Sequence, residues 1–453
     1  MLKANKTRLN IVICGGGIAG LAAAGALAPH HDVTVLERKP DIHEGAYGIN
    51  LKPNASLVAI ELLGIEVTPP PSSSSLTSFE AEAEAEAGGG LRGVPCCEVV
   101  ERSAEDGVEQ MRIGVDAETM FGAPWYLCRR DELLQQLYRT ARQRGVDVRL
   151  DVSVRGLEQE NTTDGRASGP VSTQTSNGET VHADLVLVAD GIASKLRRYV
   201  LDGRGSVPNG LAAPGSASTK DALIVDSGQV AFRALVAWTD LAGDATLSYL
   251  TRPSHGGLYV WAGRKQRLVV YPCPGSVNIV AIVDKDALHP AAAGASSVPS
   301  AATAEVLRDQ FSTFHSSATR LLDHVRTASL WALNDLEPLA RSGRGCVYLV
   351  GDASHATLPH QGQGASLAFE DAEALATMLA DLDDASPTTI GSALHATSAL
   401  RTPRIRAIQH ASRVMARPAD YAKGEKGDAL RFSQLMLKYK GINDLAHTES
   451  KQP

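Results

Sequence analysis

The chain has 453 residues, of which 43% are hydrophobic, and a formal net charge of -7 at pH 7. This is enough for two or three domains with a buried core, and without a basic excess we expect a small-molecule partner, no nucleic acid and no anionic membrane. The six cysteines lack the spacing of a metal site or a disulfide framework, which predicts no metal and a reducing, cytoplasmic location.

The first predicted unit is a strand, a glycine turn, a helix and a second strand. Residues 9–14 form the first strand, the helix ends near Pro29, and residues 31–37 form the second strand. The uncharged stretch 9–28 is also typical of a signal peptide or a membrane span. Three glycines early in this stretch and the strand after it favour a cytosolic βαβ unit with no membrane span.

The glycine turn has the spacing of a dinucleotide cradle. Gly15, Gly17 and Gly20 follow a strand and precede a helix, so the cofactor's pyrophosphate is expected at the helix N-terminus. Glu37 closes the second strand, where a carboxylate accepts from ribose hydroxyls and repels a 2′-phosphate. This favours FAD or NAD over NADP, and we assign Ala19 and Arg38 to the same site.

The middle of the first half alternates helices and strands. We predict a helix from Asn54, as its N-cap, to Gly64, a second helix over 131–145, and a doubly buried strand over 183–189. Residues 69–90, with the strings PPPSSSS and AEAEAEAGGG, are predicted to be a low-complexity insertion that carries no chemistry.

The second half begins with a different pattern. Short strands separated by turns predict a separate, mostly antiparallel sheet, followed by a helix near 303–325. The predicted strands cover 229–237, 246–250, 257–262, 267–271 and 277–283.

The fold class expected from these elements is α/β, with a Rossmann-like FAD-binding domain, a mostly antiparallel substrate domain and a helical C-terminus. The predicted divisions are 1–68, 91–200 and 336–385 for the FAD-binding domain, 69–90 for the insertion, 201–335 for the substrate domain and 386–453 for the C-terminal region.

FAD is long enough to need a second contact region, and the residues near 350 offer one. A buried strand over 346–350 ends at Asp352, which can accept from ribityl hydroxyls. Gly362, Gly364 and Ala365 open the next helix, whose free N–H groups suit the flavin pyrimidine edge. A plain strand, loop and helix with a capping aspartate would leave the same pattern.

Three motifs in this order resemble the fingerprints of the group A FAD-dependent monooxygenases, the family of p-hydroxybenzoate and salicylate hydroxylases. They are GGGIAG, ADGIASKLR and GDASHATLPHQGQGASLAFEDA. The resemblance covers most of the chain, since GAYGINLKPNA, APWYLCRRDELLQQL and VYPCPGSVNIVAIV also look like fungal salicylate-hydroxylase-type sequences.

The resemblance implies an activity. Group A enzymes reduce FAD with NAD(P)H, form a flavin C4a-hydroperoxide with molecular oxygen, and hydroxylate a small aromatic substrate such as a phenol or an aromatic acid. They have no separate nicotinamide domain, and this chain has no second GxGxxG.

The resemblance also implies site residues. Asp190, with Gly191, Ser194 and Arg197, belongs to the motif that touches both FAD and the nicotinamide; the alternative is a strand end and a capped helix with a surface arginine. Arg130 matches an FAD-contacting arginine, although Arg129 is an alternative match.

Three residues are candidates for the catalytic pocket. Arg233 resembles the substrate-facing arginine of some members, Tyr271 can donate its hydroxyl to the same substrate group, and His360 flanks the flavin loop. Their alternatives are a surface arginine, a core tyrosine and a histidine that contacts the backbone.

Two other functions fit the same fold. A flavin-dependent epoxidase or reductase of an isoprenoid-like substrate is the first, and the charged tail over 400–453 argues against the apolar helix that it would use for membrane contact. A non-catalytic flavin redox sensor is the second.

Overall fold

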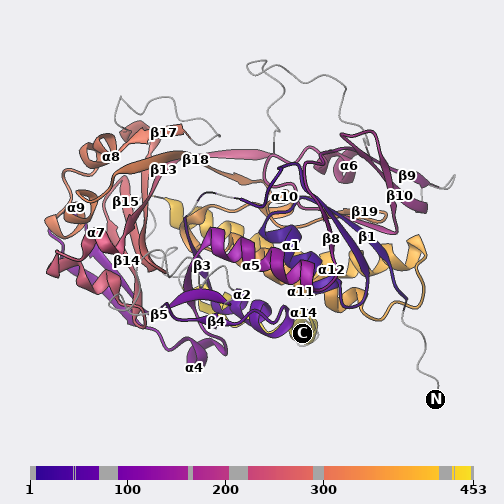
Figure 1. Ribbon diagram of the computed structural model, residues 1–453, viewed down its shortest axis with the longest axis horizontal. Helices are drawn as coiled ribbons and strands as arrows, with labels where there is room; N and C mark the ends of the chain where they lie inside the picture. The colour runs from indigo at the N-terminus through magenta and orange to yellow at the C-terminus, as the bar shows by residue number, and fades with distance from the viewer. Residues whose placement is uncertain are drawn as a thin grey trace.

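The computed structural model describes residues 7–43, 45, 47–70, 90–161, 167–203, 223–288, 300–417, 431–432 and 434–449. Two large sheets lie at opposite ends of the molecule, and several long helices run between and beneath them (Figure 1). Most of the predicted insertion, residues 71–89, lies outside the described residues. Its flanks meet, because Leu91 N donates to Glu66 O at 2.9 Å.

The smaller sheet is the expected dinucleotide-binding sheet, and all its strands are parallel except β19. Its order is β19 (Gly343–Arg344), β20 (Val347–Leu349), β12 (Leu185–Val188), β1 (Asn10–Cys14), β2 (Asp32–Leu36) and β8 (Asp147–Arg149). Every residue of β12 and β20 is buried, as is usual where helices cover both faces of a sheet.

Four helices accompany this sheet: α1 (Ile18–Leu27), α5 (Arg130–Gln143), α11 (Gly364–Leu379) and α12 (Pro387–Ala416). The alanine-rich α1 packs against both α5 and α11. Its small, buried side chains let these helices approach closely, which brings the start of α11 near the glycine turn. The predicted α/β fold with a helical C-terminus is confirmed, and α14 (Ile442–Glu449) adds a short helix beside α11 and α12.

The larger sheet is mostly antiparallel and contains more of the chain than the sequence predicted. Its order is β17 (Ser300–Thr303), β18 (Thr327–Leu336), β13 (Ile224–Ala237), β16 (Ser276–Asp284), β15 (Gln266–Cys273), β14 (Gly256–Ala262), β5 (Leu91–Ser103), β7 (Tyr126–Arg129) and β3 (Gly48–Leu51). Both β4 (Val67–Thr68) and β6 (Glu109–Gly114) pair with β5. The predicted separate, mostly antiparallel sheet is confirmed, but it is larger than expected, because β3, β5 and β7 join it from the first third of the chain.

The two faces of the larger sheet differ. Phe232, Val270 and Trp261 lie in a core with α8 (Ala304–Gln310) and α9 (Ser316–Leu322), which cover the outer face (Figure 1). Side chains alternate along a strand, so Arg233 and Tyr271 point to the opposite face. That face meets β3, since Gly48 N donates to Asn278 Oδ1 at 2.8 Å.

Gly48 is required at this contact. A Cβ placed there would lie 2.6 Å from both Asn278 Cβ and Tyr271 Cε2.

Three local predictions were wrong. Residues 246–250 are not a strand but part of a 3₁₀ helix (Ala245–Thr251), because the Asp244 carboxylate accepts from Thr246 N and caps that turn. The helix expected near 303–325 is two short helices, α8 and α9. Asn54 is not an N-cap; Lys52 holds that position, and Asn54 lies buried inside α2 (Pro53–Leu57).

A short sheet of β9 (Val154–Asn161), β10 (Ala167–Thr175) and β11 (Thr180–Ala183) completes the architecture. Within the described ranges, no helix is both long and apolar enough to cross a membrane.

Candidate cofactor and substrate site

The glycine turn has the geometry of a phosphate cradle. A Cβ on Gly15, whose φ is +120°, would lie 2.4 Å from Ala189 O, and a Cβ on Gly20 would lie 1.9 Å from Gly15 O. A Cβ on Gly17 would meet no atom within 4 Å. Gly15 and Gly20 therefore make the turn possible, whereas Gly17 borders open space at the N-terminus of α1, where a pyrophosphate would rest.

Glu37 is fixed beside this turn. Its Oε2 accepts from Gly16 N at 2.6 Å and its Oε1 from Lys39 N at 2.9 Å. Two backbone donors hold the carboxylate at the carboxyl end of β2, where the adenosine ribose of a dinucleotide is bound in this fold. Arg38 is exposed next to it.

The three sequence motifs meet in space. The first touches the second where Gly15 approaches Ala189, and it touches the third where Gly351, at φ +58°, faces Ala19; a Cβ on Gly351 would lie 2.5 Å from Ala19 Cβ. Arg197 joins the second and third motifs, since its Nε donates to Ala353 O at 2.8 Å.

Two residues of the middle motif differ in exposure. Arg197 is 1% exposed, so the alternative of a surface arginine is wrong. Asp190 is exposed, and its carboxylate accepts from Lys195 N at 3.2 Å.

The expected flavin loop faces the same region. Asp352 is exposed at the end of β20, and its Oδ1 would lie 4.0 Å from a Cβ on Gly364, the first residue of α11. Gly362 has φ +56° and turns the chain into that helix, with Ala365 in its first turn.

This loop is rich in unused hydrogen-bonding capacity. Buried side-chain atoms without a partner among the described residues belong to Thr357, Gln361, Gln363 and Ser366. Since buried polar groups are normally paired, these atoms fit a polar ligand such as the ribityl and pyrimidine parts of FAD.

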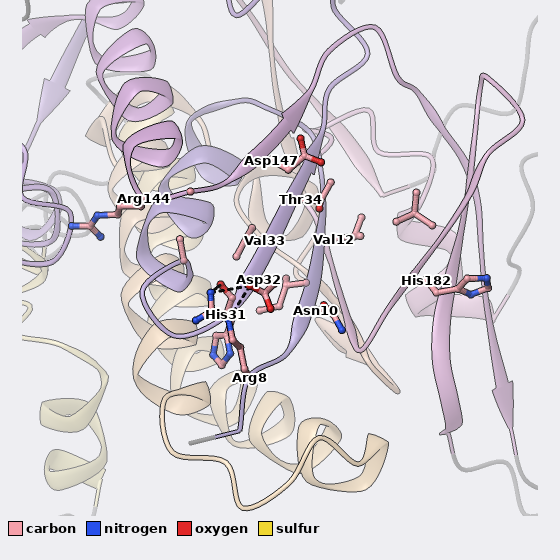
Figure 2. A pocket seen from close by; sticks show the side chains of 14 residues that line it. Arg8, Asn10, Val12, His31, Asp32, Val33, Thr34, Arg144, Asp147 and His182 are labelled. Carbon is pink, nitrogen blue, oxygen red and sulfur yellow. Dashed lines mark hydrogen bonds and ion pairs between the residues drawn. The ribbon is translucent and has the colours of Figure 1, made fainter. Parts of the chain in front are cut away.

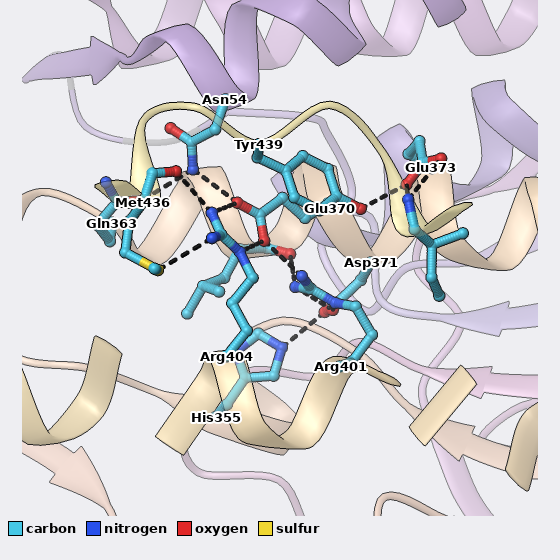
Figure 3. A network of polar contacts seen from close by, with 12 residues as sticks. Asn54, His355, Gln363, Glu370, Asp371, Glu373, Arg401, Arg404, Met436 and Tyr439 are labelled. Carbon is cyan, nitrogen blue, oxygen red and sulfur yellow. Dashed lines mark hydrogen bonds and ion pairs between the residues drawn. The ribbon is translucent and has the colours of Figure 1, made fainter. Parts of the chain in front are cut away.

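A buried ionic network supports this loop (Figure 3). It consists of Glu370 and Asp371 on α11 and Arg401 and Arg404 on α12, and we call it the α11–α12 network. Glu370 pairs with Arg404 at 2.6 Å and also contacts Arg401, and Asp371 pairs with Arg401 at 3.0 Å. The side chains of all four are at most 6% exposed. Two acids and two arginines compensate each other, as buried charges must.

The α11–α12 network also holds both ends of the flavin loop. Asp371 Oδ2 accepts from Gly351 N at 3.0 Å and lies 2.6 Å from His355 Nε2. At the other end, Asn54 Nδ2 donates to Gln363 Oε1 at 3.0 Å and to Glu370 Oε1 at 2.7 Å. Burial opposes ionisation, but His355 and Arg401 lower the pKa of Asp371 to about 2.

The sequence did not reveal this network, although Glu370 and Asp371 lie in the third motif. Its arginines lie some thirty residues further along the chain, and no spacing rule links them to α11. His355 contacts Asp371 of this network, so its position in the structure supports the loop. His360 lies half-buried in the short 3₁₀ helix Pro359–Gln361.

The two candidate arginines before α5 differ in their partners. The Arg129 guanidinium pairs with Asp131 at 2.7 Å and with Glu132 at 3.6 Å. Arg130 donates its backbone N–H to Tyr47 O at 2.7 Å, and its charge acts on Arg233. Two carboxylates therefore neutralise Arg129, whereas Arg130 lies close enough to Arg233 for their charges to interact.

The substrate side of the site is built around Arg233 on β13. Its guanidinium carbon lies 5.0 Å from the Trp331 ring centroid and 5.7 Å from that of Tyr47, and its buried Nε has no hydrogen-bond partner among the residues that the structure describes. Among the described residues, the groups that act electrostatically on Arg233 are Tyr271, Arg130 and Tyr47, and none of these is a carboxylate. Burial and Arg130 lower the pKa of Arg233, although a guanidinium stays protonated at neutral pH.

The aromatic neighbours complete this wall. Tyr47 and Trp331 meet edge to face at 5.8 Å, and Tyr47 OH lies 2.8 Å from Ser329 Oγ. Burial raises the pKa of Tyr271, so its hydroxyl stays a neutral donor. Tyr271 lies on β15, which is separated from β13 by β16. Tyr47 and Trp331 were missed because no sequence period connects them to Arg233.

Another hollow, of about 320 Å³, lies at the opposite edge of the smaller sheet (Figure 2). Asn10 and Asp32, at the amino ends of β1 and β2, line it together with His31, whose pKa burial lowers to about 4. Ligands of such sheets bind at the carboxyl ends of the strands, so this hollow is not the cofactor site.

The glycine cradle, the fixed carboxylate after β2 and the facing loop before α11 define a protein that binds an extended dinucleotide such as FAD. Residues 8–408 match the family described as FAD binding domain, and the chain belongs to that family.

The chain is also similar to known FAD-dependent monooxygenases. A salicylate hydroxylase of Pseudomonas putida is 29% identical over 427 residues, covering 91% of this chain and 86% of the relative. The FAD-dependent monooxygenase OpS4 of Beauveria bassiana is 27% identical over 387 residues, covering 83% and 78%. Among solved structures, a salicylate hydroxylase substrate complex has a TM-score of 0.70 at 20% identity and covers 97% of this chain and 98% of its own.

The resemblance inferred from the motifs is thereby confirmed. The chain is an FAD-dependent monooxygenase of the aromatic-hydroxylase type, with NAD(P)H as its co-substrate.

Proposed function

We propose that the protein hydroxylates a small aromatic substrate that binds as an anion, a phenolate or an aromatic carboxylate, against Arg233. One observation carries this proposal: Arg233 is a largely buried cation between two aromatic rings with no carboxylate partner within the described residues. Placing a charge there without a partner is costly, so an anionic ligand is its natural complement.

Separate groups of residues would bind the two ends of FAD. FAD, when bound, supplies the chemistry that activates oxygen after reduction by NAD(P)H. Gly15, Gly17, Gly20 and Glu37 would hold its adenine end, and Asp352, Gly362 and Gly364 its flavin end. The loop's unpaired polar atoms support this assignment.

Arg233 would orient the substrate and favour its ionised form, because a nearby cation lowers the pKa of a phenol and the phenolate is more nucleophilic. Tyr271 would donate a hydrogen bond to the same group, and the rings of Tyr47 and Trp331 would keep water from it. His360 would line the pocket from the flavin loop, and Arg130 and Asp190 would face the cofactor.

The proposed location is the cytoplasm. All six cysteines are free, which is typical of a reducing compartment. The proposed division of the chain keeps a discontinuous FAD-binding domain and a substrate domain, with β3, β5 and β7 shared at the boundary.

Replacing Arg233 with alanine should weaken substrate binding by about 1.5 to 3 kcal/mol while FAD stays bound and reducible by NAD(P)H. A substrate held loosely cannot keep water out, so residual turnover should release hydrogen peroxide. Substrate-induced changes in the flavin spectrum and peroxide release measure both effects. Arg252→Ala, at an exposed position, is the control and should behave as wild type. Wild-type affinity and coupling in Arg233→Ala would remove Arg233 from the pocket.

A further inference from the structure

Lys52 is a buried cation next to the flavin loop. The residue follows β3 and precedes α2 in the chain, and it is 9% exposed. Nζ donates to Gln361 O at 2.5 Å and lies 5.0 Å from the Trp125 ring centroid. These two contacts direct the ammonium group toward the turn that leads into α11.

No carboxylate compensates this charge in the part of the chain that the structure describes. Burial lowers the pKa of Lys52 to about 8, and the neighbouring Cys96 thiol is neutral because burial raises its own pKa. This differs from the α11–α12 network, where each arginine has an acidic partner. An uncompensated buried cation beside a ligand site is a common sign of function, because the ligand can supply the missing charge.

The distance to the flavin loop is short. A Cβ on Gly362 would lie 3.4 Å from Lys52 Cε and 3.9 Å from Lys52 Nζ. The Trp125 ring that Lys52 contacts is itself held in place, since Trp125 Nε1 donates to Asn50 Oδ1 at 3.2 Å. Lys52 therefore has one well-defined place beside Gly362, one of the residues assigned to the flavin.

We propose that Lys52 is a positioning residue for the flavin, whose charge stabilises the negative charge that the ring gains on two-electron reduction. The proposal rests on FAD binding at the Gly362–Gly364 loop, as in the proposed function. Arg233 would then serve the substrate and Lys52 the cofactor, so these two cations would face different anions.

The test uses the FAD-loaded Lys52→Met variant, which keeps most of the length and the apolar character of the side-chain stem but removes the charge. Its flavin midpoint potential should fall by about 30 mV or more, which corresponds to a tenfold change in the two-electron equilibrium. Sulfite adds to oxidised flavin and leaves negative charge on the ring, so the sulfite dissociation constant should rise at least tenfold. Neither measurement needs substrate or turnover.

Three further variants make the result specific. Lys52→Arg keeps the charge and should restore both values most of the way toward wild type. Lys52→Gln repeats the charge removal with a polar side chain, and Lys265→Met removes an exposed lysine and should change nothing. Variants that bind FAD weakly are titrated with sulfite at saturating FAD.

Wild-type potential and sulfite affinity in both Lys52→Met and Lys52→Gln would overturn the proposal, even if substrate binding were weaker. The proposed function fails differently: a wild-type protein that binds FAD and sulfite but hydroxylates no aromatic compound would contradict it and leave the role of Lys52 intact.

Discussion

Replacing Gly17 with valine is expected to give a folded protein that cannot hold FAD. A Cβ at this position meets no protein atom within 4 Å, and the Gly17 backbone is extended, with φ −76° and ψ −175°. A β-branched side chain is compatible with that backbone. The valine would therefore fill the space that the pyrophosphate needs without disturbing the surrounding protein, and the purified variant should be colourless.

Gly20→Val is the matched comparison. A Cβ on Gly20 would lie 1.9 Å from Gly15 O, so this substitution should prevent the turn itself and lower stability or solubility. Circular dichroism and thermal unfolding separate the two cases, and absorbance after denaturation gives the FAD content. A folded Gly17→Val protein with a full complement of FAD would show that the cofactor does not use this turn.

Replacing Arg401 with methionine should have the largest effect on stability. The change removes one partner of both Glu370 and Asp371 and leaves net negative charge in a site where the Arg401 side chain is 1% exposed. Breaking a buried ionic contact in this way costs about 3 to 5 kcal/mol. Since Asp371 also holds Gly351 N, FAD affinity should fall as well.

Acid stability provides a second measurement on Arg401→Met. In the wild type the pKa of Asp371 is depressed to about 2, so its stabilising contribution is complete above its unfolded pKa and is lost as the pH falls toward 2. Without Arg401 the pKa of folded Asp371 should be higher, so its contribution should be smaller and the loss on acidification should end at a higher pH. Arg149→Met is the control, because Arg149 also pairs with two carboxylates, but its side chain is 37% exposed and those of Asp147 and Glu179 are 51% and 50% exposed; it should cost no more than about 1 kcal/mol. Equal stability losses in the two variants would contradict a special role for the α11–α12 network.

The dinucleotide-binding half of the fold could be predicted because its signals are local. The buried strands β1, β12 and β20 are short apolar runs, and the glycine spacing fixes the turn between β1 and α1. The three motifs could be recognised separately, and their meeting follows from the rule that the carboxyl ends of parallel strands share one edge.

The larger sheet was only partly predictable. Strands β13 to β16 follow one another closely and alternate, but β3 and β5 reach the sheet from the first third of the chain, and no local pattern shows which sheet a strand joins. The segment 246–250 is rich in strand-forming residues, yet the Asp244 cap favours a helical turn.

The catalytic pocket depends on long-range contacts. Arg233 was identified through a family resemblance, but its cage combines Tyr47 from the first fifty residues with Trp331 from β18. Lys52 was visible in the string GAYGINLKPNA, but its burial and its lack of an acidic partner can be known only from the structure.

The central claim is that this protein hydroxylates an anionic aromatic compound with FAD, NAD(P)H and oxygen. The most direct test screens phenols and aromatic acids for stimulated NAD(P)H oxidation and determines product mass. We expect at least one aromatic acid or phenol to stimulate oxidation and to gain the mass of one oxygen atom, and uncharged analogues of that compound to be poor substrates. Stimulated oxidation that yields only hydrogen peroxide across the panel, or none at all from an FAD-loaded protein, would contradict the account.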